Sequence, residues 1–319
     1  MTAFVTSIES VVEIILVIAL GFYLRKKNKF DDQFKTSISF LIMNIALPAS
    51  IFSSVLKYLT REKLIGLSSG LLYASGSFII GYIIAWVLTK LLHVRPGRRG
   101  TFINMFVNAN TIFIGLPLNL ALFGEASMPY FLIYYVLNTV STWAIGVFFI
   151  TNDDPTKDKS TAKFNWRKLL PAPLVGFLVA LVFLLLAIPV PNWVNSTLTM
   201  VGGIVTPMSL IYIGIVLADA GLASIHFDRD TIWALLGRFI FTPAVMIGIL
   251  MLATHGGAQI PNLESSTLII QAAAPGLAVL PILAGQAHGD VEYATNVVTT
   301  STVLFVVVVP ILMQLVQLV

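Results

Sequence analysis

The sequence contains no cysteine, which excludes disulfide bonds, a thiol nucleophile and thiolate metal ligands. Charged residues are scarce as well, at 11% of the 319 residues, whereas soluble proteins carry roughly 25%. Hydrophobic residues make up 57% of the chain instead. This composition is typical of an integral membrane protein. The net charge of +4 then reflects orientation in the lipid bilayer, and we expect no nucleic-acid partner.

Motifs for catalysis are absent too. The 4 histidines lie at the ends of apolar runs, so their spacing predicts no metal site. The sequence has no phosphate-binding P-loop, no nucleophile elbow and no HExxH motif. An ATP-driven pump and an intramembrane protease therefore lack support, and we expect neither an enzyme nor a cofactor. A membrane receptor remains an alternative, although the longest polar linker is too short for a soluble output domain.

The apolar runs predict an all-α integral membrane fold of ten transmembrane helices. We expect these spans at about residues 8–24, 36–56, 64–92, 101–123, 127–150, 169–188, 193–218, 231–253, 265–287 and 292–317. A polar linker at 151–168 separates a first half, 1–150, from a second half, 169–319. Five spans in each half predict two inverted repeats. Most lysines and arginines fall in alternate connections, so the positive-inside rule predicts a multi-pass cell-membrane protein with both termini outside.

The fourth and ninth spans carry polar residues and prolines that a plain lipid anchor does not need. The stretch 102–124 contains a polar cluster and then Pro117, and the stretch 269–285 contains Pro275 and Pro281. Proline removes a backbone donor, so we expect Pro117 to interrupt the fourth helix near mid-span. Paired interrupted helices in two halves of a chain indicate the binding site of a transporter.

Two further prolines extend the internal similarity. Pro48 lies in the second span and Pro207 in the seventh, at corresponding places of the two halves. These matches favour a duplication. We expect all five prolines to shape the site without contacting what binds there.

The polar residues around the interruptions are the candidate ligands of a substrate. Amide donors and free backbone N–H groups at a half-helix N-terminus favour an anion. The alternative is that these polar residues only form hydrogen bonds between helices. The candidates are Asn108, Asn110, Thr111, Gln271 and Gly276.

Two charged residues within spans need separate explanations. Arg238, in the eighth span, is a candidate for attracting an anion, but it could also extend to the cytoplasmic interface or pair with Asp219 or Asp230. Glu13, in the first span, is a candidate for proton coupling, because burial raises the pKa of a glutamate.

Several motifs resemble the auxin efflux carrier family. NTIFIGLPL at Asn110–Leu118 is similar to that family's fourth span, and GRFIFTPAVM at Gly237–Met246 and IIQAAAPG at Ile269–Gly276 are similar to its eighth and ninth. The resemblance runs through most of the chain, without the large central domain of the plant members. In one respect the chain departs from the plant members, because its third span, Leu64–Leu92, contains no carboxylate.

The resemblance implies a dimer with two crossing broken helices. It also implies a scaffold of spans 1, 2, 6 and 7 and a moving unit of spans 3–5 and 8–10, with substrate at the crossing and Asn110 in the binding motif. The bacterial members point to a dicarboxylate such as malate, carried by elevator-type alternating access. An auxin-like monocarboxylate exporter is the alternative. Because the broken segments contain no carboxylate, we expect coupled protons to travel on the substrate as its monoanion.

Overall fold

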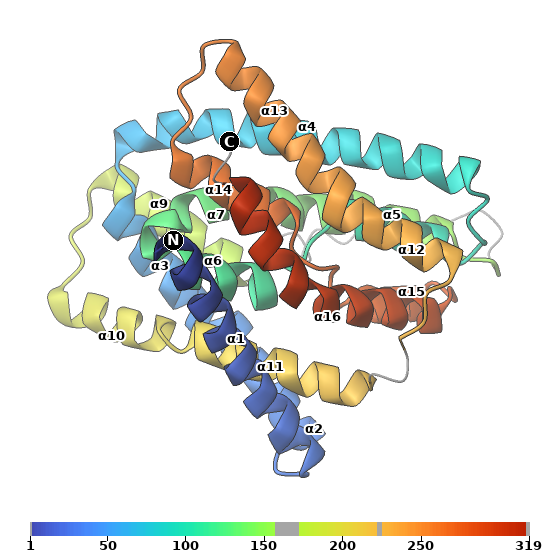
Figure 1. Ribbon diagram of the computed structural model, residues 1–319. Helices are drawn as coiled ribbons and strands as arrows, with labels where there is room; N and C mark the ends of the chain where they lie inside the picture. The colour runs from blue at the N-terminus through green and yellow to red at the C-terminus, as the bar shows by residue number, and fades with distance from the viewer. Residues whose placement is uncertain (1, 157–171, 222–224, 317–319) are drawn as a thin grey trace.

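The computed structural model describes residues 2–156, 172–221 and 225–316 (Figure 1), and every regular element in these ranges is a helix. The part of the linker after Thr156 and the start of the sixth span, up to residue 171, lie outside the described residues. The first half contains α1 (Thr2–Lys26), α2 (Asp32–Leu41), α3 (Leu47–Tyr58), α4 (Arg61–Leu91), α5 (Arg99–Val107), α6 (Leu116–Phe123), α7 (Met128–Val140) and α8 (Val147–Asn152). The second half contains α9 (Ala172–Leu186), α10 (Asn192–Gly202), α11 (Val205–Ala220), α12 (Arg229–Leu236), α13 (Thr242–His255), α14 (Asn262–Ala272), α15 (Leu280–Gln286) and α16 (Val291–Val316).

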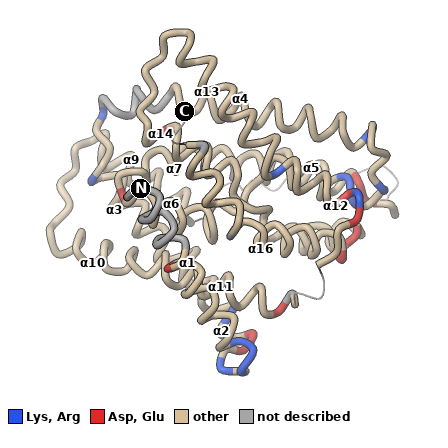
Figure 2. The backbone as a smooth tube through the Cα atoms, viewed as in Figure 1, with Lys and Arg blue, Asp and Glu red and all other residues tan. Residues whose placement is uncertain are grey.

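Several helices are suited to a membrane. Within the described residues, 5 continuous helices are long and apolar enough to span a bilayer, at 32–58, 69–91, 125–152, 192–219 and 229–255. The bent α16 raises this number to 6, and shorter apolar helices lie at Thr111–Phe123 and Ala172–Leu186. Most charged residues gather at the ends of the long helices (Figure 2), as expected for a membrane protein. The predicted total of ten spans remains a prediction.

Wide helical turns accommodate three of the prolines. π-helical turns at Ile42–Ala46, Thr111–Gly115 and Gly237–Phe241 come directly before the helices whose first turns hold Pro48, Pro117 and Pro243. Proline lacks the N–H that a regular helix needs, but the first turn of a helix tolerates it. These prolines therefore change the winding of a helix without breaking it.

The two expected interruptions are present, but Pro117 does not cause the first. Helix α5 ends at Val107 and helical geometry resumes at Thr111, so the interruption lies at 108–110, well before Pro117. The prediction was wrong on this point because Pro117 occupies the tolerant first turn of α6. The second interruption runs from 273 to 279, between α14 and α15, and includes Pro275.

The two interruptions lie side by side. Ala109 and Gly276 form an isolated antiparallel bridge, and the Asn110 N–H donates to the Pro275 carbonyl oxygen at 2.8 Å. One backbone N–H of the first break is thus satisfied by a carbonyl of the second, as a low-dielectric environment requires. A large buried apolar cluster surrounds this contact, including Met105, Phe106 and Ala274. A second cluster packs α3 against α7 and α9.

Candidate functional site

A cavity of about 330 Å³ opens beside the paired interruptions; we call it the break cavity. Its walls come from the first interruption, from α7 and the turn after it, from the end of the second interruption and from Met43 before α3. The lining residues are Met43, Ala109, Asn110, Thr111, Ile112, Phe113, Tyr135, Asn138, Thr139, Thr142, Trp143, Leu277, Ala278 and Val279. No charged side chain belongs to this lining. The break cavity is therefore polar in places but uncharged.

Asn110 and Thr111 are the two predicted ligands that line the break cavity. The Asn110 side-chain oxygen caps the next helix by accepting from the Phe113 N–H at 3.2 Å. This bond aims the amide group and leaves its NH₂ without a hydrogen bond among the described residues. The Thr111 hydroxyl likewise has no hydrogen-bond partner among the described residues. Two donors beside a helix N-terminus are therefore available to an anion.

Asn138 of α7 holds the first interruption in its extended form. Its side-chain oxygen accepts from the Ala109 N–H at 2.8 Å, and its NH₂ donates to the Ala109 carbonyl at 2.9 Å. The side chain therefore acts like a neighbouring strand. Sequence reasoning missed this residue. The signal was the group of polar residues Asn138, Thr139, Ser141 and Thr142 within an otherwise apolar span.

Asn108 lies away from the break cavity, in a buried polar network. Its NH₂ donates to the Tyr82 hydroxyl at 3.0 Å and to the Asn104 side-chain oxygen at 2.8 Å. Its own oxygen accepts from the Ser141 hydroxyl at 2.6 Å. Both donors of its amide and one lone pair of its oxygen are engaged by protein. The position favours the alternative reading of Asn108, a hydrogen bond between helices.

Gln271 and Gly276 are buried on the far side of the interruptions. The Gln271 NH₂ donates to the Gly115 carbonyl at 2.9 Å, while its oxygen has no partner among the described residues. The Gly276 N–H donates to the Ser301 hydroxyl at 3.2 Å. A Cβ at Gly276 would collide with the Met105 sulfur, so a larger residue there requires the buried Met105 side chain to shift. Neither residue lines the break cavity.

Arg238 forms hydrogen bonds with the backbone on both sides of the paired interruptions and does not line the break cavity. Its guanidinium is fully buried and donates to the carbonyl oxygens of Met105 at 2.8 Å and Ala274 at 3.2 Å, and also to that of Phe106. It therefore neither extends to the interface nor forms the suggested ion pairs. Asp219 instead pairs with Arg25 and Lys35, and Asp230 lies near Arg98 and Arg229. Those two structural readings of Arg238 are wrong, because carbonyls freed by the breaks satisfy the guanidinium.

The remaining predicted residues lie elsewhere. Glu13 is exposed on α1 and does not line the break cavity. Pro281 is in the first turn of α15, and Pro207 lies near the start of α11. Among the described residues no group of three potential His, Cys, Asp or Glu metal ligands occurs.

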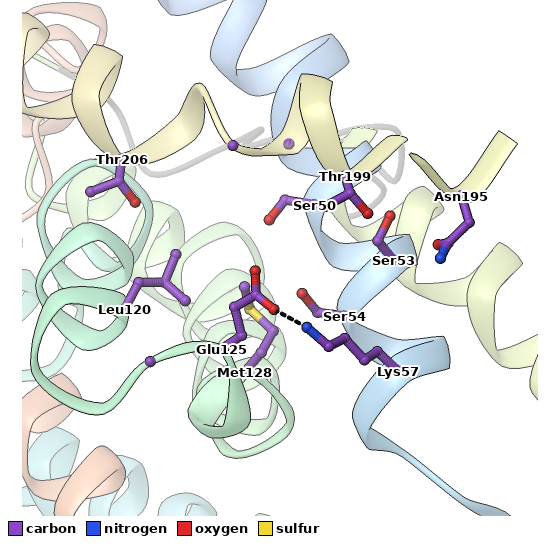
Figure 3. Close-up of a pocket in the computed structure, with 13 residues that line it drawn as sticks. Ser50, Ser53, Ser54, Lys57, Leu120, Glu125, Met128, Asn195, Thr199 and Thr206 are labelled. Carbon is purple, nitrogen blue, oxygen red and sulfur yellow. Dashed lines mark hydrogen bonds and ion pairs between the residues drawn. The ribbon is translucent and has the colours of Figure 1, made fainter. Parts of the chain in front are cut away.

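A second cavity, of about 290 Å³, lies near the Lys57 end of α3; we call it the polar cavity (Figure 3). Met128 lines the polar cavity and Tyr135 lines the break cavity, on the same face of α7. Both belong to one buried apolar cluster, together with Phe131 and Leu132. Along α7, apolar side chains therefore separate the two cavities.

The sequence is similar to known transport proteins over nearly its whole length. The family described as membrane transport protein matches residues 6–313. An uncharacterized transporter of Methanothermobacter thermautotrophicus is 23% identical over 312 residues, covering 96% of this chain and 97% of the relative. An uncharacterized transporter of Methanocaldococcus jannaschii is 21% identical over 301 residues, covering 92% and 94% respectively.

Proposed function

Because the chain belongs to the membrane transport protein family, the auxin efflux carrier family that its motifs resemble, we propose that it is a secondary carrier of a small organic anion. The family is one of transporters, not of enzymes. The observation that carries the proposal is the meeting of two helix interruptions at a cavity with available donors. The Asn110 amide and the Thr111 hydroxyl, with the N-terminus of the helix that follows, would bind a carboxylate of the substrate in the break cavity.

The uncharged lining of the break cavity bears on the charge of the substrate. A dianion would bring a second full charge into a site without a lysine or arginine, and burying an unpaired charge is costly. This supports a substrate that carries one negative charge in the cavity. A dicarboxylate such as malate would then bind as its monoanion. An auxin-like monocarboxylate is the second candidate, and the same uncharged lining favours it.

The surrounding residues would hold the site without contacting the substrate. Arg238 would fix the interruptions through three carbonyls, and Asn138 would clamp Ala109. Gln271 and Gly276 would set the spacing between the interruptions. In this proposal Asn108 keeps α5 in contact with α4 and with the turn after α7.

We further propose alternating access by an elevator-type movement. The proposal includes ten spans in two inverted halves with crossing broken helices, both termini outside, and a homodimer, as the resemblance implies. The scaffold would comprise α1–α3 and α9–α11, and the moving unit the remaining helices. Both cavities adjoin the border between these groups: Met43 faces the break cavity from before α3, and α3, α10 and α11 face the polar cavity.

Uptake of labelled malate into proteoliposomes tests the proposed function. The purified carrier is expected to take up malate above the level of protein-free liposomes, with and without imposed pH and voltage gradients. Unlabelled malonate and a small aromatic monocarboxylate added as competitors would distinguish the two substrate candidates. Binding without uptake would favour a receptor. If the carrier neither bound nor took up any of these anions, that result would contradict the proposal.

A further inference from the structure

One carboxylate of the protein is held by two donors at the mouth of the polar cavity. The Lys57 ammonium donates to the Glu125 Oε2 at 2.7 Å (Figure 3). The Tyr58 hydroxyl donates to the same oxygen at 2.8 Å. Both donors come from the end of α3, whereas Glu125 belongs to the short turn after α6. An ammonium and a phenol that converge on one oxygen atom form a binding site for a carboxylate.

The polar cavity behind this ion pair is lined by hydroxyl groups from two sides. Ser50, Ser53, Ser54 and Lys57 recur at helical spacing on one face of α3, inside an otherwise apolar span. The Ser53 hydroxyl is buried and has no hydrogen-bond partner among the described residues. On the other side, α10 contributes Thr199 and α11 contributes Thr206. Such a lining suits a small solute with a carboxylate and further oxygen atoms.

We propose that the polar cavity is a second binding site for the transported anion, in which the Glu125 carboxylate occupies the place of a substrate carboxylate. An incoming anion takes over the Lys57 and Tyr58 donors, and Glu125 is released to water. This inference rests on the proposed function.

The exchange is energetically feasible because the ion pair is exposed. The Lys57 and Glu125 side chains are 61% and 49% accessible, and exposed pairs of this kind contribute little to stability. A ligand carboxylate that gains the same donors, and also the hydroxyl groups behind them, can therefore displace Glu125.

Displacement of Glu125 by the substrate would also break a contact between the proposed scaffold and the proposed moving unit. Lys57 and Tyr58 lie on α3, in the proposed scaffold, and Glu125 lies in the proposed moving unit. While Glu125 is bound, the ion pair is one tie between these groups on this side of the apolar cluster. Arrival of substrate removes the tie, so that binding at this face and movement are linked.

The test compares the two partners of the ion pair in transport assays from each face of the membrane. We expect Lys57→Met to raise the KM for malate about tenfold or more at one face, because it removes a charge-assisted donor. We expect Glu125→Gln to lower the KM at that face about two- to fivefold, because it removes the internal competitor. Arg61→Met is the matched control. It removes an exposed cation outside both cavities, whose guanidinium donates to the Leu185 carbonyl of α9, so it breaks a contact between the two groups without changing the polar cavity and should leave KM unchanged.

Opposite shifts in KM for the two variants, at one face only, would support the second site. A simple structural tie predicts shifts of the same sign, because either substitution breaks it. Shifts of the same sign, or unchanged KM at both faces, would overturn the inference. Uptake by the unaltered carrier in the same experiment reports on the proposed function independently.

Discussion

Replacing Asn138 by alanine is expected to destabilise the protein, because this side chain bonds both backbone groups of Ala109. The change leaves the N–H of the fully buried Ala109 without its partner at 2.8 Å. It also removes one of the two donors to the Ala109 carbonyl, which the Thr111 N–H still reaches at 2.9 Å. Hydrogen bonds between helices in membranes average ~0.6 kcal/mol, so two give a lower bound of ~1.2 kcal/mol. Leaving the buried N–H unsatisfied costs about 1–3 kcal/mol, and the lost bond to the carbonyl adds about 0.5–1.5 kcal/mol, which gives an upper bound of ~4.5 kcal/mol.

The assay is thermal unfolding of the purified variant in detergent, followed by malate binding. Thr139→Ala is the matched control, since Thr139 also lines the break cavity but its hydroxyl donates only to the Tyr135 carbonyl of its own helix. We expect Asn138→Ala to lower the unfolding temperature clearly more than Thr139→Ala, and to weaken binding as well. Equal stability of the two variants would refute the reasoning that Asn138 fixes the interruption.

Three other predictions follow from the site and its proposed movement. Gly276→Ala places a Cβ against the Met105 sulfur, so it should lower thermal stability, and Met105→Ala added to it should restore part of the loss; full stability of the single variant would contradict the close approach. Cysteines introduced at Ser54 and Leu120, which line the polar cavity from α3 and α6, should abolish uptake when joined by a bifunctional reagent; undiminished uptake would argue against movement. Uptake should fall as external pH rises, in step with the substrate's second ionisation, and Glu13→Gln should not alter this profile; uptake that follows the dianion, or a profile abolished by Glu13→Gln, would contradict transport of the monoanion.

The helical character of the chain and the existence of two interruptions could be predicted from the sequence. Apolar runs of span length leave helices as the expected structure in lipid, and the polar cluster at 108–111 and the Pro275 segment are too costly for uninterrupted spans. The exact place of the first interruption could not be predicted from Pro117. A proline within an apolar run predicts a break in the helix, but the π-helical turn before Pro117 allows the helix to continue through it.

The contacts of Arg238 and Asn138 that hold the interruptions could not be predicted from the sequence for a different reason. Arg238 donates to carbonyl oxygens, which every residue carries, so no pattern of side chains marks its partners. Asn138 likewise recognises backbone, and it lies in a span without a proline near it. By contrast, Asn110 and Thr111 were identified because polar residues next to an interruption have a physical reason to line a cavity.

The most direct measurement of the central claim is the affinity of malate for variants of Asn110. Asn110→Ala removes the free amide donor and also the helix cap, whereas Asn110→Ser keeps an oxygen for the Phe113 N–H and replaces the amide donor by a shorter hydroxyl. Asn44→Ala is the control, because the Asn44 amide donates to the Phe40 carbonyl of its own span. Loss of a hydrogen bond to a charged group predicts about 10- to 150-fold weaker binding for both Asn110 variants and unchanged binding for the control. Unchanged affinity in folded Asn110→Ser and Asn110→Ala proteins would contradict the claim that substrate binds in the break cavity.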